Sequence, residues 1–137
     1  MSQRRTHLRG ASSRPVGDAR SAYLAAWRWR REVELALRPL DLTFTQWLVL
    51  DATASAISEL EDDHAVSQRE VAEFCELDPM TVSQVMTTLA LRGLVDRGPS
   101  ATGRSYRIIL SASGRRTLQS AASHIKAATE RFWAGER

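Results

Sequence analysis

The stretch LDPMTVSQVMTTLALRGLVDRG, residues 77–98, decides the fold because it predicts one well-bounded helix. Asp78 is a natural N-cap, and Pro79 suits the first helical position, where a missing N–H costs nothing. Gly93 is typical of the residue that follows a helix end. The predicted inward stripe repeats at a spacing of three or four residues and consists of Val82, Val85, Met86 and Leu89.

The opposite face of this helix is uncharged, although a solvated helix usually carries Glu and Lys there. It presents Met80, Gln84, Thr87 and Leu91, with Thr81, Ser83 and Thr88 on its shoulders. In the major groove of DNA, Gln pairs with adenine, Ser and Thr pair with several bases, and methyl groups meet thymine. We therefore interpret this face as one that meets DNA. A solvent-facing surface without a partner is the alternative.

The flanking segments predict a winged helix-turn-helix. Ser67 and Glu70 match the S-x-x-E capping box and predict a short helix whose apolar residues are Val71, Ala72, Phe74 and Cys75. This helix joins the next one through a tight turn, which is the helix-turn-helix arrangement. LVDR (94–97) and RSYRIIL (104–110) then predict two strands of a hairpin, the wing, with Tyr106, Ile108 and Leu110 on one side.

Three further helices are predicted around this unit. The first runs from about Asp18 to before Pro39, with a face of Ala22, Ala26, Trp29, Val33, Leu37 and Leu40. The second follows Thr43 or Thr45 and buries Phe44, Trp47, Leu48, Leu50 and Ile57. The last runs from Ser111 to about Trp133 and buries Leu118, Ala122, Ile125, Thr129 and Phe132. Residues 1–17 read as a flexible, Arg-rich arm, and residues 61–66 as an acidic connection.

Composition bounds the class of protein. With 137 residues, 43% of them hydrophobic and 26% charged, the chain predicts one soluble globular domain. The predicted helices and the hairpin make it mainly α (α+β). Nine Arg against three acids give residues 1–38 a net charge of +6, and six Arg against Asp96 give residues 79–116 a net of +5. Residues 51–78 carry nine acids against one Arg, a net of −8. The two basic regions favour a polyanionic partner.

These motifs resemble the MarR (multiple-antibiotic-resistance regulator) family of winged-helix transcription factors. The resemblance rests on LTFTQWLVL, on VSQREVAEFCELDPMTVSQVMTTLALRGLVDRG and on GRSYRIILSASGRRTL. It implies a homodimer paired through helices of about residues 19–38 and 112–133, a DNA-binding lobe of about 43–110, and one domain over 18–137. Thr102 departs from the family pattern, which has an Asp two residues before the wing arginine, here Arg104.

Together, the polar face and the resemblance define a candidate site for double-stranded DNA. Arginines near the helix end and on the hairpin are expected to contact phosphates, and Arg104 is expected to reach the minor groove. The resemblance implies that the helix from Pro79 to Arg92 is the recognition helix. The predicted set is Ser67, Gln68, Met80, Thr81, Ser83, Gln84, Thr87, Thr88, Arg92, Arg97, Arg104 and Arg107.

The resemblance also implies a small aromatic effector bound between the dimer helices and the DNA lobe. Aromatic walls and a nearby arginine would suit an aromatic carboxylate. The predicted residues are Tyr23, Trp27, Arg30 and Trp47, and core packing is the alternative for the aromatic ones.

No other site is expected. The sequence shows no nucleophile–base set and no phosphate-binding glycine loop, so we expect neither an enzyme nor a cofactor. Residues 61–64 (EDDH) read as a solvated loop rather than a metal site, and Cys75 as a structural thiol. No apolar run is long enough for a membrane span or a signal peptide, so the cytoplasm is expected. The expected function is a repressor of a pseudo-palindromic promoter site, and the alternative is a winged-helix module that binds proteins.

Overall fold

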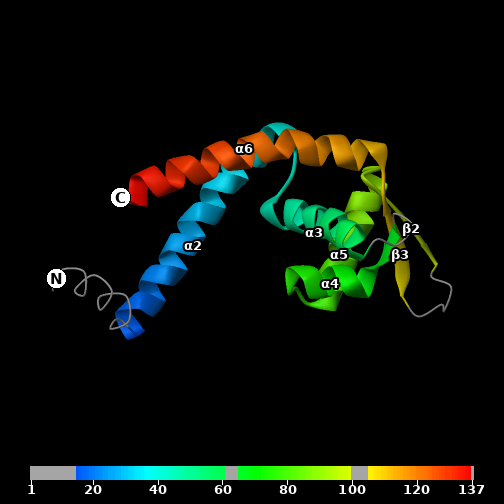
Figure 1. The fold of residues 1–137 in the computed structure, drawn as a ribbon, viewed down its shortest axis with the longest axis horizontal. Helices are drawn as coiled ribbons and strands as arrows, with labels where there is room; N and C mark the ends of the chain where they lie inside the picture. The colour runs from blue at the N-terminus through cyan, green and yellow to red at the C-terminus, as the bar shows by residue number, and fades with distance from the viewer. Residues whose placement is uncertain (1–14, 61–64, 100–104, 137) are drawn as a thin grey trace.

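The computed structural model describes residues 15–60, 65–99 and 105–136 (Figure 1). Its elements confirm the expected class, a mainly α fold with a small sheet. In chain order they are α2 (Pro15–Leu37), the 3-10 turn η1 (Arg38–Leu40), α3 (Phe44–Leu60), β1 (Ala65–Ser67), α4 (Gln68–Cys75), α5 (Pro79–Leu91), β2 (Val95–Pro99), β3 (Tyr106–Leu110) and α6 (Ala112–Glu136).

The sheet has three antiparallel strands in the order β1-β3-β2. The hairpin of β2 and β3 was predicted, whereas β1 was missed because residues 65 and 66 were assigned to the acidic connection. Val66 pairs with Ile108, and both side chains are buried. A strand of three residues is too short to show an alternating pattern, so only this pairing reveals it.

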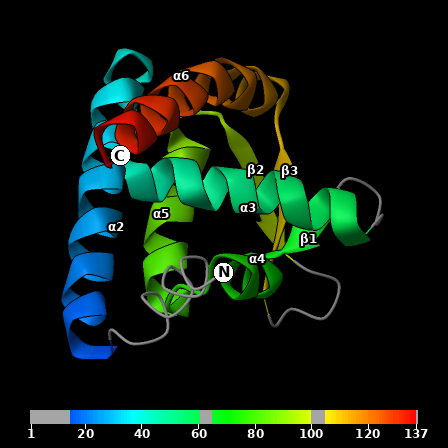
Figure 2. The same cartoon turned by 60° about the vertical axis from the view of Figure 1, so that its left-hand side comes forward.

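The core of the lobe lies between α3, α4, α5 and the sheet (Figure 2). Val82, Met86 and Leu89 of α5 are fully buried, as the inward stripe predicted, and Val85 is half-buried. Phe74 differs from its apolar neighbours on α4 because 43% of its surface is exposed.

The predicted caps of the two central helices are all formed. The backbone N–H of Glu70 donates to Ser67 Oγ at 3.1 Å, and the N–H of Ser67 donates to Glu70 Oε1 at 2.9 Å. Asp78 caps α5 by accepting from the N–H of Thr81 at 3.0 Å. Gly93 follows α5 with φ of 74°, a conformation that suits glycine.

We expect the change Ser67→Ala to lower the free energy of unfolding by about 1 kcal/mol, because it leaves a helix N–H without its acceptor. Urea unfolding followed by circular dichroism measures this loss. Ser55→Ala is the matched control, since Ser55 is exposed within α3. That control should be neutral or slightly stabilising because alanine favours the helix interior. Equal losses in the two variants would contradict a capping role.

Helices α2 and α6 pack against each other, and α6 runs above the lobe (Figure 1). Helix α2 begins at Pro15, three residues earlier than expected, because proline is readily accepted in a first helical turn. The buried residues of α6 are Gly114, Ala121, Ala128 and Phe132, with Ile125 half-buried. The prediction of Ala122 in this face was wrong by one position.

The outer half of α2 is largely exposed among the described residues. Ala22 and Ala26 were expected on a buried face, but both are exposed, whereas Val33 and Leu37 are fully buried. Figure 1 shows the N-terminal half of α2 extending away from the lobe. Its apolar face therefore has no cover within one described chain.

Candidate nucleic-acid interface

The outward face of α5 lies between α4 and the hairpin, both of which contact this helix. Met80 and Leu91 are 68% and 84% exposed, and Gln84 and Thr87 are also exposed. The shoulder residues Thr81, Ser83 and Thr88 are half-buried. The structure thus brings the predicted polar residues of α5 together on one accessible strip.

The threonine hydroxyls on this strip donate to acceptors within the protein. Thr87 donates to the carbonyl of Ser83 at 3.1 Å, and Thr88 donates more weakly to that of Gln84 at 3.5 Å. The hydroxyl of Thr81 donates to Asp78 Oδ2 at 3.2 Å. Because a hydroxyl has one proton, these threonines present mainly methyl groups and lone pairs outward. Gln84 keeps an exposed amide that both donates and accepts.

Arg97 donates hydrogen bonds within the chain from all three of its guanidinium nitrogens. Nε donates to Gln68 Oε1 at 3.1 Å, Nη1 to Thr87 Oγ1 at 2.7 Å and Nη2 to Ser83 Oγ at 3.0 Å. The guanidinium also lies 3.9 Å from the centre of the Tyr106 ring. Arg97 of β2 therefore joins the hairpin to α4 and α5, and its phosphate contact stays a prediction.

Arg92 also binds groups of its own chain. Its Nη1 donates to the carbonyl of Asp41 at 2.6 Å, and its Nη2 to that of Leu40 at 3.3 Å. Asp41 ends η1 with φ of 56°. The two hydrogen bonds from Arg92 to the carbonyls of Leu40 and Asp41 stabilise this turn. Arg92 therefore stabilises the turn between α2 and α3, and because the residue is exposed, its phosphate contact stays a prediction.

The remaining predicted DNA contacts lie on α4 and the hairpin. Gln68 is half-buried in the first turn of α4, and Ser67 caps that helix. Arg107 is exposed on β3, opposite Ser67 in the register of the sheet. Thr102 and Arg104 lie outside the described residues.

The predicted effector residues are brought together only in part. Arg30 lies 4.8 Å from the centre of the Phe44 ring and donates to Thr45 Oγ1 at 3.4 Å, and Trp47 lies 5.6 Å from Phe44 between ring centres. Tyr23 and Trp27 are instead exposed on the outer half of α2. Sequence reasoning did not place Phe44 and Thr45 in this cluster, because it assigned Phe44 to the core.

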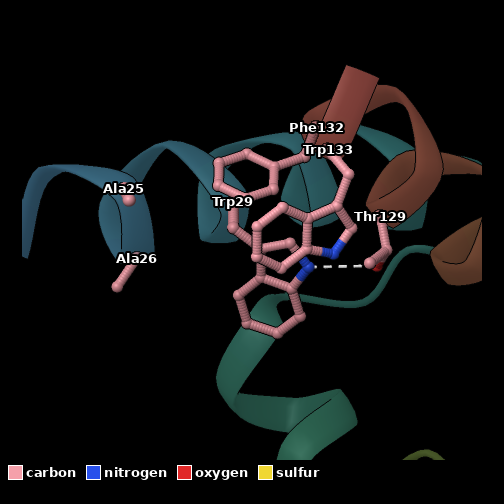
Figure 3. Close-up of a pocket in the computed structure, with 6 residues that line it drawn as sticks. All are labelled: Ala25, Ala26, Trp29, Thr129, Phe132 and Trp133. Carbon is pink, nitrogen blue, oxygen red and sulfur yellow. Dashed lines mark hydrogen bonds between the residues drawn. The ribbon is translucent and has the colours of Figure 1, made fainter. Parts of the chain in front are cut away.

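A separate apolar hollow of about 370 Å³ lies between α2 and α6 (Figure 3). Trp29 lines it and donates from Nε1 to Thr129 Oγ1 at 3.0 Å. The predicted effector residues do not line it. Its lining consists of Ala25, Ala26, Trp29, Thr129, Phe132 and Trp133.

Cys75 is half-buried, and its thiol donates to the carbonyl of Val71 at 3.1 Å. Burial raises the pKa of this thiol, so at neutral pH it remains protonated. The half-buried thiol thus agrees with the expectation of a structural cysteine. The EDDH segment, residues 61–64, lies outside the described residues. Among the described residues, no helix combines the length and the apolar content that a membrane span requires.

Comparisons with known proteins give consistent results. The MarR family model matches residues 40–104, which include the helix-turn-helix and part of the hairpin. YdcH of Bacillus subtilis, described as an uncharacterised HTH-type transcriptional regulator, is 34% identical over 73 residues, which are 53% of this chain and 48% of the relative. The match thus spans about half the length of that curated relative.

The whole described fold also matches solved structures. A MarR-family transcriptional regulator from Rhodococcus sp. RHA1 is 28% identical, with a TM-score of 0.73 over 88% of this chain and 82% of that one. A MarR-family protein of Mycobacterium tuberculosis, solved with p-aminosalicylic acid, is 28% identical, with a TM-score of 0.65 over 85% of this chain and 83% of that one. The capped helix α5, the three-stranded sheet and these matches make the chain similar to MarR-family proteins, in sequence over residues 40–104 and in fold over most of its length.

Proposed function

We propose that this protein is a DNA-binding transcriptional regulator that acts as a homodimer on a pseudo-palindromic promoter site, most simply as a cytoplasmic repressor. The observation that carries the proposal is the exposed, uncharged strip of α5, framed by α4 and the wing. Uncharged hydrogen-bonding side chains on a helix suit the major groove, where base edges present donors and acceptors. The curated relative and the Rhodococcus protein, both described as transcriptional regulators, support the same function.

Dimerisation is proposed to pair α2 and α6 of one chain with those of a second. The exposed aromatic residues of these helices support this pairing, because Tyr23, Trp27 and Trp133 are 67%, 48% and 56% exposed. Apolar side chains gathered on one surface usually mark a protein interface. A two-fold dimer would place its recognition helices on half-sites about one helical turn apart.

The proposed effector is a small aromatic carboxylate that releases the protein from DNA. The solved complex of the Mycobacterium relative with p-aminosalicylic acid supports this ligand class. In this chain, Arg30 beside Phe44 and Trp47 offers a cation next to aromatic walls at the junction of α2 and α3. Tyr23 and Trp27 are proposed to complete the site from the outer half of α2. The ligand must bind the arrangement that cannot hold DNA more tightly than the one that can.

The decisive experiment is selection of bound fragments from a random DNA pool at about 0.15 M salt, where non-specific binding is weak. Recovery of an inverted repeat is the expected result. Protein that is folded and dimeric yet recovers no sequence would overturn the proposal and favour a winged-helix module that binds proteins.

We expect Gln84→Ala to cost about 1–3 kcal/mol of binding to the selected site and to relax the preference at one base position, because Gln84 offers both donor and acceptor to a base edge. Competition binding with single-base variants of the site measures both effects. The control is Gln119→Ala, an exposed glutamine on α6 outside the proposed site. Equal loss on all sequences would show that Gln84 does not read a base.

A further inference from the structure

The bonds of Arg97 fix the direction of the polar groups around it. A guanidinium has donors and no acceptor, so every group that it bonds must turn an oxygen toward it. Gln68 presents Oε1 to Arg97 Nε at 3.1 Å. The amide nitrogen of Gln68, with its two donors, must therefore point away from Arg97. Gln68 lies in the first turn of α4, on the side where that helix meets α5 and the hairpin.

The two hydroxyls bonded to Arg97 are affected differently. Ser83 accepts from Arg97 Nη2 at 3.0 Å, which leaves the serine proton available for another acceptor. Thr87 accepts from Nη1 at 2.7 Å and already donates to the carbonyl of Ser83 at 3.1 Å. Its single proton is therefore used, and its exposed methyl group becomes the outward feature.

On these bonds we propose that Arg97 is a positioning residue that makes Gln68 and Ser83 hydrogen-bond donors toward DNA. The inference rests on the proposed function and adds the chemistry of the recognised atoms. Those atoms must be acceptors on base edges: N7 and O6 of guanine, N7 of adenine, or O4 of thymine. The amino groups of cytosine and adenine are excluded at these two contacts because they are donors themselves.

Arg97 is held in place from the hairpin side, which makes this a link between wing and helices. The Tyr106 ring of β3 stacks 3.9 Å from its guanidinium, and the backbone of Arg97 pairs with Ile108. A shift of the wing would move the guanidinium and release Gln68 Oε1 and Ser83 Oγ. The donor pattern of the recognition surface therefore depends on the wing lying where it does.

The test uses Arg97→Lys, which keeps the positive charge but lacks the planar fork that bonds three acceptors at once. Wild-type protein first selects its DNA site. The variant is then measured on that site and on its single-base variants at several salt concentrations. We expect discrimination among those sequences to fall about tenfold, with an unchanged dependence of affinity on salt because the charge is kept. Arg115→Lys, at an exposed position on α6, is the control and should match wild type.

A second variant, Gln68→Met, keeps a side chain of similar length but removes the amide. It therefore removes one proposed donor while the arginine at position 97 is kept. It should also lose discrimination, and the double variant should discriminate no less than Arg97→Lys alone, since the Gln68 contact is one of the two that Arg97 positions. Full discrimination in either single variant, or multiplied losses in the double variant, would overturn the inference. Failure of the wild-type protein to select any site would instead overturn the proposed function, and this inference with it.

Discussion

The double variant Trp27→Glu/Trp133→Glu should be monomeric and should bind the selected DNA site at least about 100-fold more weakly than wild type. Trp27 and Trp133 are 48% and 56% exposed on α2 and α6. Carboxylates there would have to be desolvated within an apolar interface, which is costly without a partner charge. A monomer holds one half-site and loses the high effective concentration that a tethered second lobe provides.

Light scattering gives the oligomeric state, and fluorescence anisotropy with labelled DNA gives the affinity. Phe74→Glu is a suitable control for the oligomeric state, because Phe74 is also an exposed aromatic residue but lies on α4. The control should remain dimeric. A double variant that stays dimeric at micromolar concentration would refute pairing through α2 and α6.

Features encoded by a few neighbouring residues could be predicted from the sequence. The capping box of Ser67 and Glu70, the Asp78 cap and the left-handed Gly93 all formed as expected. Each depends on contacts three or four residues apart, so the chemistry of the segment suffices. The buried stripe of α5 followed for the same reason, because helical periodicity alone places it on one face.

Features that depend on distant partners could not be predicted in this way. Strand β1 exists because it pairs with β3, about 40 residues later in the sequence. Arg92 bonds Asp41, 51 positions away, and Arg97 bonds Gln68, 29 positions away. The sequence shows the charge of each arginine but not its acceptors, so both were assigned to phosphate. The same charge count cannot separate an arginine that contacts DNA from one that positions other side chains.

The turn between α4 and α5 shows a related limit. Glu76 ends α4 with φ of 53°, a left-handed conformation that usually marks glycine. The backbone N–H groups of Glu76 and Leu77 donate to the carbonyls of Glu73 and Ala72, which close the helix end. The location of the turn was predictable, but a glutamate gives no local signal of this conformation. The packing of the two helices against the lobe imposes it.

The largest expected loss of stability comes from Gly114→Ala, on the order of 3 kcal/mol. Gly114 lies in the first turn of α6, where a Cβ would overlap the carbonyl oxygen of Leu94 and lie 2.9 Å from Leu110 Cδ1. A backbone carbonyl cannot rotate away as the end of a flexible side chain can. The start of α6 would therefore have to move away from the Gly93–Leu94 turn.

That movement is opposed by the hydrogen bonds of Ser111, which is why the cost should be large. Its hydroxyl donates to the carbonyl of Gly93 at 2.6 Å and accepts from the N–H of Gly114 at 2.9 Å, and its N–H donates to the carbonyl of Leu94 at 3.2 Å. Chemical unfolding measures the loss. Gly135→Ala is the control, since a Cβ there meets nothing within 4 Å, and it should be neutral or slightly stabilising. If Gly114→Ala were as stable as this control, α6 could start further from Leu94 at no cost, and the close approach would not be needed to join α6 to the wing.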